Sequence, residues 1–283
     1  MAAFFDTHAH LDYPDYANDL TEVIARAQAA GISKIISIGT DLDSSRRAIG
    51  LAEKFPNIFA AIGWHPSNAH EAPDDIRDSL RELVKHPKVV AIGETGLDYH
   101  HLPSEKCSVG SASRQLAHSA NATTSDDDAR YKLKQSEIFQ QHLEIAAEFK
   151  LNCVIHQRDS FDDTLAQLKP FAGKVHGVFH CFGESVARMQ EVFEIGSLVS
   201  FTGIVTFKNA QNVRDCVAAA PLGKFMLETD CPYLAPVPFR GKRCEPAYVK
   251  EISEMVAQVK NCSLEELSAA TCETAAEFFQ KLR

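Results

Sequence analysis

The chain of 283 residues is 45% hydrophobic and 24% charged, as in ordinary soluble proteins; no apolar run approaches the roughly 18 residues of a membrane span, and no secretory leader is recognisable. Its formal charge of −9 excludes a protein that coats nucleic acid by bulk electrostatics, so any phosphate contact should be local. We therefore expect a monomeric cytoplasmic protein, with the nucleus as the alternative in a eukaryotic cell.

Short β-rich runs alternate with amphipathic stretches along the chain. The expected strands are residues 3–8, 34–38, 58–63, 89–94, 152–156, 175–180, 197–202 and 224–229. The expected helices are residues 20–30, 44–54, 74–86, 136–150, 160–168, 184–195, 211–219, 247–260 and 263–282, the last opening with a Ser263/Glu266 capping box. Eight apolar strands separated by helices of this length favour one closed (β/α)8 TIM barrel, spanning residues 1–283, over an open sheet.

One segment breaks the alternation. Residues 101–130, after the fourth expected strand, are rich in Ser, Ala, Asn and Asp and include the acidic triplet Asp126-Asp127-Asp128. No helical or strand period runs through them, so we predict a flexible polar insertion loop. Because the segment follows a strand that ends in a candidate ligand, a lid over the site is the alternative.

Two histidines close the first expected strand. His8 and His10 are two residues apart, so on a strand both side chains lie on the same face. Two neutral imidazoles on a stiff backbone can chelate a divalent cation. A polar pair at a strand end is the alternative when this motif is taken alone.

Chelating or acidic residues also follow most other expected strands: His65 the third, Glu94 the fourth, His156 the fifth, His180 the sixth and Asp230 the eighth. In a barrel of this kind the carboxyl ends of all strands meet on one face, where active sites are built. We therefore expect these residues to converge with the histidine pair, although they are far apart in sequence. The other histidines considered, His70, His86, His118 and His142, fall on predicted loops or helices and are expected to be structural.

The number of these groups exceeds the need of a single tetrahedral ion. Even without His65, four imidazoles and two carboxylates remain, and they fit a two-metal site better, with the two oxygens of Glu94 as a bridge. Such a pair of ions can activate a water and hold the attacking and leaving oxygens. Asp230 would orient or deprotonate that water as general base, so Glu94 and Asp230 are the catalytic candidates.

The ordered motifs resemble the signature set of the TatD family of metal-dependent deoxyribonucleases, within the amidohydrolase-like barrels. The matching segments are residues 5–12, 93–99, 155–156, 179–182 and 228–236, and the resemblance extends over nearly the whole chain. It implies a nuclease that hydrolyses DNA phosphodiesters, as a 3′ to 5′ exonuclease on single strands. It also implies metal roles for His8, His10, Glu94, His156, His180 and Asp230.

Four further residues are candidates for substrate binding. His65 can donate to a phosphate oxygen, and Arg158 can make a forked contact with the same group. Arg240 and Lys242 belong to a basic cluster that follows three prolines, for which a solvated loop is the alternative. Just after this cluster, Cys244 stands where relatives usually carry Asn, so contacts of that loop cannot be transferred from the family.

Several alternatives remain open from the sequence. Imidazole and carboxylate ligands accept Mg²⁺, Mn²⁺ or Zn²⁺; we expect the first two, with zinc as the alternative. The eight scattered cysteines lack any Cys-x-x-Cys pair and should be reduced and mostly structural. The competing functions are a metal-dependent amidohydrolase acting on a small-molecule amide, for which a closed apolar pocket would speak, and a binding protein that has lost catalysis. The complete ligand set argues against the last.

Overall fold

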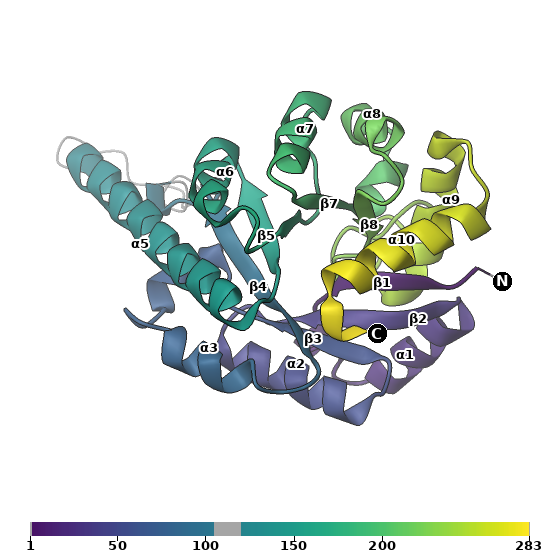
Figure 1. Cartoon of the computed structure of the whole chain (residues 1–283), viewed down its shortest axis with the longest axis horizontal. Helices are drawn as coiled ribbons and strands as arrows, with labels where there is room; N and C mark the ends of the chain where they lie inside the picture. The colour runs from purple at the N-terminus through teal and green to yellow at the C-terminus, as the bar shows by residue number, and fades with distance from the viewer. Residues whose placement is uncertain (1, 105–119, 283) are drawn as a thin grey trace.

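The computed structural model describes residues 2–104 and 120–282. Its strands form one parallel sheet in chain order: β1 (Phe4–Ala9), β2 (Ile32–Ile38), β3 (Ile58–Ile62), β4 (Val89–Asp98), β5 (Cys153–Arg158), β6 (Gly177–Phe179), β7 (Leu198–Phe201) and β8 (Phe225–Leu227). The carboxyl ends of β1 and β8 meet through a parallel bridge between Ala9 and Cys231. The (β/α)8 barrel predicted from the sequence is therefore confirmed (Figure 1).

Helices follow the strands and cover the outside of the sheet (Figure 1). They are α1 (Leu20–Ala29), α2 (Leu42–Lys54), α3 (Arg77–Leu83), α5 (Ala120–Phe149), α6 (Phe161–Leu168), α7 (Val186–Glu194), α8 (Gln211–Ala219), α9 (Val249–Lys260) and α10 (Leu264–Phe278). Short 3₁₀ helices are η1 (Pro14–Tyr16), η2 (Pro66–Glu71), η3 (Lys169–Phe171), η4 (Gly203–Thr206), η5 (Pro246–Tyr248) and η6 (Gln280–Leu282). The predicted capping box begins α10, with reciprocal hydrogen bonds between Ser263 and Glu266. In the described ranges no helix is long and apolar enough to cross a membrane.

The strands are apolar on both faces because both faces are buried. Along β2, Ile35 packs in the main core with the surrounding helices, whereas Ile36 belongs to a second cluster that includes Phe278 and Phe279. Asn152, directly before β5, donates a hydrogen bond from Nδ2 to the Phe278 carbonyl oxygen (2.8 Å). The end of the chain thus lies against the amino ends of the strands, and the functional residues gather at the opposite end.

The predicted insertion differs from the structure. Because α5 begins at Ala120 rather than near residue 136, the loop predicted for residues 101–130 is wrong from residue 120 onward. Residues 105–119, with Cys107 and His118, lie outside the described part of the chain. The lid alternative depends on them and stays a prediction.

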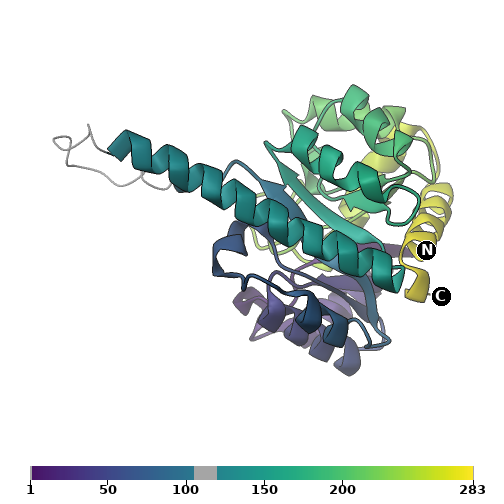
Figure 2. The same ribbon diagram turned by 60° about the vertical axis from the view of Figure 1, so that its left-hand side comes forward.

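The missed helical turns leave no periodic signal because they do not pack against the barrel. The first part of α5 projects beyond the barrel (Figure 2), and Asp126, Asp127 and Arg130 are exposed there. From residue 126 on, where the side chains of α5 are described, the buried positions begin at Tyr131 and continue through residues such as Phe139. A helix shows an apolar stripe only where it has a surface to cover, so the sequence revealed only the packed part.

Candidate metal centre

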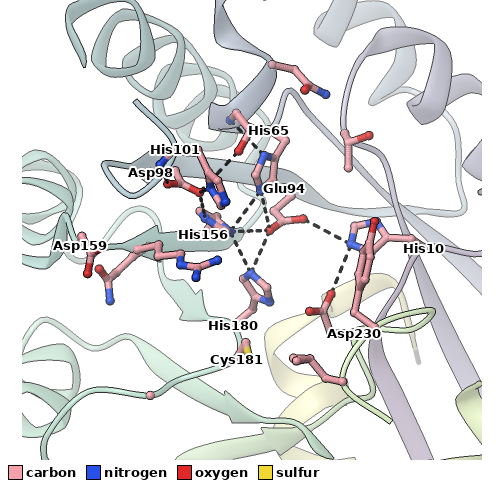
Figure 3. A pocket seen from close by; sticks show the side chains of 18 of the residues that line it. His10, His65, Glu94, Asp98, His101, His156, Asp159, His180, Cys181 and Asp230 are labelled. Carbon is pink, nitrogen blue, oxygen red and sulfur yellow. Dashed lines mark hydrogen bonds and ion pairs between the residues drawn. The ribbon is translucent and has the colours of Figure 1, made fainter. Parts of the chain in front are cut away.

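The carboxyl ends of the strands open into a cavity of about 830 Å³. Its lining includes His10, His65, Glu94, His156, His180 and Asp230, and His8 lies fully buried beneath it. Figure 3 shows the six lining side chains pointing toward one another from separate strands and loops. The convergence of strand ends expected from the sequence is therefore present in the structure.

One group of donors faces Oε2 of Glu94. His8 Nε2 and His10 Nε2 are 3.2 Å apart, and they lie 3.4 and 3.7 Å from this oxygen. Oδ1 of Asp230 is 3.6 Å from His8 Nε2 and 3.4 Å from His10 Nε2. The backbone fixes this group, since the Asp230 N–H donates to the His8 carbonyl oxygen at 2.9 Å.

A second group faces Oε1 of the same carboxylate. Glu94 Oε1 is 3.0 Å from His156 Nδ1 and 2.9 Å from His180 Nε2. These two imidazole nitrogens are 3.2 Å apart. His65 Nε2 also reaches the group, 3.3 Å from Glu94 Oε1 and 3.2 Å from His156 Nδ1. Each oxygen of Glu94 thus belongs to a different cluster of imidazoles.

These distances suit bound cations. Ligand bonds of about 2.0–2.2 Å place neighbouring ligand atoms of a tetrahedral or octahedral ion about 2.8–3.6 Å apart. The nitrogen pairs His8/His10 and His156/His180 have this spacing. Two imidazole nitrogens that face each other need a proton or an ion between them, because both cannot act as acceptors. The donor set therefore fits divalent cations.

The charges of the centre depend on one another. Burial alone would raise the pKa of Glu94, but the surrounding histidines hold it well below its ordinary value. Burial opposes the charged form of His180, but Glu94 and Glu228 raise its pKa well above the ordinary value. Burial likewise disfavours protonated His156, but Asp98 and Glu94 raise its pKa. Divalent cations would take the place of protons that these imidazoles otherwise hold.

Two carboxylates behind the imidazoles received no role from the sequence. Asp98 Oδ2 lies 3.1 Å from His156 Nε2, on the side of the ring turned away from Glu94. Glu228 Oε1 is 3.6 Å from His180 Nδ1 and accepts a 2.7 Å hydrogen bond from the Cys181 N–H. Carboxylates in such positions fix the orientation and basicity of metal-binding imidazoles. Spacing could have identified them, since Asp98 and Glu94 share one face of β4, and Glu228 is two residues before Asp230.

Asp98 is itself held in place by α5. Its backbone N–H donates to Gln135 Oε1, and Gln135 Nε2 donates to its carbonyl oxygen, both at 2.9 Å. Its Oδ2 also lies 2.9 Å from His101 Nδ1. Helix α5 thereby supports the candidate metal centre, a role that the sequence did not indicate.

The backbone before Glu94 requires glycine. Gly93 has φ of 150°, a region that side chains other than hydrogen rarely allow. A Cβ on Gly93 would lie 2.7 Å from the Val154 carbonyl oxygen, and one on Gly63 would lie 2.7 Å from the Gly93 carbonyl carbon. The close approach of β3, β4 and β5 therefore fixes the position of Glu94.

The four candidates for substrate binding occupy different places. His65 lies within the second donor group, and Arg158 is an exposed residue of the cavity lining. Arg240 and Lys242 are exposed but do not belong to the described lining. The guanidinium of Arg240 stacks 3.7 Å from the Phe207 ring centroid.

The remaining cysteines and the loop that contains Cys244 have structural surroundings. The seven described cysteines are free thiols, as predicted. Cys244 is buried; its N–H donates to the Pro232 carbonyl oxygen, and its carbonyl oxygen accepts from the Tyr16 hydroxyl at 2.6 Å. Neighbouring Arg243 is paired with Asp19 at 2.7 Å, so this member of the basic cluster already has a partner.

The (β/α)8 barrel and the histidine- and carboxylate-rich centre at its mouth define a metal-dependent hydrolase. The sequence model of the family described as "TatD related DNase" matches residues 5–280. The chain belongs to this family, as the motifs indicated.

Proteins similar to this chain carry names of the same class or family. It is 38% identical over 277 residues to the "Uncharacterized metal-dependent hydrolase YabD" of Bacillus subtilis, covering 98% of each chain. It is 32% identical over 281 residues to the "3'-5' ssDNA/RNA exonuclease TatD" of Citrobacter rodentium, covering 97% of each. Among solved structures, the TatD homologue YJJV of Escherichia coli superposes with a TM-score of 0.85 at 25% identity, covering 99% of this chain and 98% of that one.

Proposed function

We propose that this hydrolase is a divalent-metal-dependent deoxyribonuclease, a 3′ to 5′ exonuclease on single-stranded DNA. The observation that carries the proposal is the division of the imidazoles between the two oxygens of Glu94, which suits a pair of cations acting on one phosphodiester. The name of the Citrobacter relative supplies the substrate class. The exposed Arg158 in the cavity favours a phosphate substrate over the small-molecule amide considered as the alternative.

The residues take the following places in this proposal. His8, His10 and Asp230 would hold one cation with Oε2 of Glu94, and His156 and His180 would hold another with Oε1. Bound there, Mg²⁺ or Mn²⁺, with Zn²⁺ as the alternative, would polarise the phosphodiester and lower the pKa of the attacking water.

Three other features of the chain serve the reaction. The Asp230 side chain remains 14% exposed to the cavity, so it can orient the water and accept its proton. His65 Nε2 and the Arg158 guanidinium can donate to the phosphate oxygens and hold the scissile group in line. Arg240 and Lys242, outside the cavity lining, would contact a more distant phosphate of a longer strand.

The test combines elemental analysis with DNA digestion. Protein purified without chelator is analysed for bound metals, and single-stranded oligomers labelled at either end are then incubated with Mg²⁺, Mn²⁺ or Zn²⁺ in turn. We expect stepwise shortening from the 3′ end, abolished by EDTA and restored by added metal. Internal cuts would contradict the exonuclease mode, and intact DNA with every metal would reject the nuclease.

Variants connect this activity to the centre. Glu94→Ala and Asp230→Asn should each abolish metal-dependent digestion. His86→Ala is the matched control, because His86 contacts Glu53 at 3.3 Å, between α3 and β4 at the far end of the barrel. Full activity in both site variants would rule out the proposed mechanism.

A further inference from the structure

Two tyrosines flank the candidate metal centre at one end of the cavity. Tyr13 follows β1 and Tyr233 follows β8, and both belong to the cavity lining. The Tyr13 ring stacks on His10, with ring centroids 4.8 Å apart and planes inclined by 22°. The Tyr233 ring stands edge-on to both, with centroids 6.4 Å from His10 and 6.3 Å from Tyr13.

Tyr233 differs from an ordinary packing aromatic in its exposure. It is 53% exposed, one of only four large apolar side chains so exposed in the part of the chain that the structure describes. None of the other three, Leu133, Leu222 and Val237, lines the cavity. An aromatic ring that stands in water beside a centre for phosphate chemistry offers a free face for another ring.

The turn that presents Tyr233 is rigidly held. Asp230 and Leu234 both adopt left-handed backbone angles, with φ of 58° and 55°, and the Tyr233 N–H donates to the Asp230 carbonyl oxygen at 3.0 Å. Such angles in residues other than glycine persist only where the surroundings enforce them. Here a Cβ on Gly203 would lie 2.2 Å from the Leu234 carbonyl oxygen, so η4 packs directly against the turn.

The two ends of the cavity have different chemistry. Tyr13 and Tyr233 lie beside His10, whereas Asp159 lies on the opposite side, across His156 (Figure 3), and its neighbour in the chain, Arg158, also lines the cavity. A nucleotide strand has the same two kinds of group, since every base has an apolar face and every link carries a charge. The tyrosine end suits a base and the arginine end suits a phosphate.

We propose that Tyr233 is a stacking platform for the base next to the scissile phosphate, with Tyr13 and His10 forming the side of the same subsite. The inference rests on the proposed nuclease function and deepens it. A base can stack there only when it has left a duplex, so the subsite selects unpaired strand ends. Recognition uses the ring face, which all four bases share, and therefore discriminates little between sequences.

The experiment compares two 5′-labelled single-stranded oligomers that differ only at the 3′-terminal nucleotide, which carries either a base or an abasic tetrahydrofuran. Stacking on an aromatic side chain contributes enough that wild type should favour the base-bearing oligomer by about 5- to 100-fold in kcat/KM. Tyr233→Ala should lose most of this preference and leave cleavage of the abasic oligomer unchanged. Tyr233→Phe, which keeps the ring, should retain the preference.

Two controls separate stacking from general damage. Leu222→Ala removes an equally isolated exposed apolar side chain outside the cavity and should change neither substrate. The metal content of Tyr233→Ala should equal that of wild type, because Tyr233 contacts His10 only at its edge. An equal loss on both oligomers, or no loss on either, would overturn the inference.

A binding measurement distinguishes failure of the stacking platform from failure of the nuclease proposal. The same oligomers are titrated against wild type and Tyr233→Ala in EDTA, with fluorescence anisotropy as the readout. The platform is supported if wild type binds the base-bearing oligomer more tightly than the abasic one and the variant shows no such difference. This conclusion holds even if wild type cleaves neither oligomer, a result that would reject only the nuclease proposal. Cleavage by wild type without any base preference in binding or turnover would reject the platform alone.

Discussion

Buried histidines occur in two regions of this protein, and their ring nitrogens have different kinds of partner. His142 in α5 is fully buried; its Nδ1 lies 2.7 Å from the Ile138 carbonyl oxygen, and its Nε2 accepts a 2.9 Å hydrogen bond from the Trp64 N–H. At the barrel mouth, His8 Nε2 instead faces His10 Nε2, and His156 Nδ1 faces His180 Nε2. Burial is common to both regions. Each ring nitrogen of His142 has a complementary hydrogen-bond partner, whereas at the barrel mouth imidazole nitrogens face one another.

The pKa directions follow this difference. Burial lowers the pKa of His142 to about 4, because no carboxylate offsets the loss of water. In the candidate metal centre burial acts in the same direction, but Asp98 and Glu94 raise the pKa of His156, and Glu94 and Glu228 raise the pKa of His180. A buried histidine with paired nitrogens is therefore a structural element, and one with facing nitrogens beside a carboxylate is a candidate ligand. Four predictions test this contrast, ordered by their expected effect on activity.

The largest effect is expected from Glu94→Gln. It keeps the shape of the residue that both donor groups share and removes its charge. Substitution of a residue that only supports a metal ligand lowers metal affinity or activity by about 10- to 100-fold. Loss of the Glu94 carboxylate, which is itself the proposed bridge, should therefore lower kcat/KM by more than about 100-fold. Elemental analysis should show little bound metal. Unchanged metal content would mean that Glu94 does not join the two groups.

Single histidine changes should separate those groups. His8→Ala removes a donor from the Oε2 side and His180→Ala one from the Oε1 side, so each should reduce bound metal from about two ions per chain to about one. Activity should fall strongly in both, because the proposed mechanism requires both ions to act on the same phosphodiester. Loss of all metal in each variant would indicate a single shared ion instead.

Asp98→Asn should have an intermediate effect. Asparagine has nearly the shape of aspartate, so it can still contact His156, but the negative charge that raises the basicity of the imidazole is lost. Metal affinity on the Oε1 side should fall by about 10- to 100-fold, and excess metal should restore most of the activity. Gln135→Ala should act in the same direction through the backbone of Asp98. Activity that stays low at saturating metal would contradict a positioning role.

His142→Gln should have the smallest effect on activity at neutral pH and a distinct effect on stability. With an ordinary pKa of 6.5 and a folded pKa of about 4, His142 binds more protons in the unfolded state between these values. Its contribution is therefore complete above pH 6.5 and is lost as the pH falls toward 4; at pH 5 the loss is about 2 kcal/mol. Urea unfolding from pH 8 to 5 should show a smaller decline in the variant. Parallel declines in both proteins would contradict the lowered pKa.

The sequence by itself determined the barrel and the residues at its carboxyl end. Apolar runs on β1 to β8 report burial on both faces, and residues that follow such runs must meet at one end once the sheet closes. The sequence alone therefore assigns His8, His10, Glu94 and His156 to one place. The local spacing of Ser263 and Glu266 likewise predicted the start of α10, because a capping box depends only on neighbouring residues.

Only the tertiary structure decided which atoms face each other. The sequence left Asp98 without a role and did not place His65 among the donors. It also could not show that Arg240, a substrate-binding candidate, lies over the Phe207 ring and outside the cavity lining. The start of α5 remained hidden for a related reason, since its projecting turns bury no apolar stripe. Periodicity records whether a side chain is buried. Distances between remote segments depend instead on how closely the backbones approach and how each loop turns, as at Gly93 and Gly203.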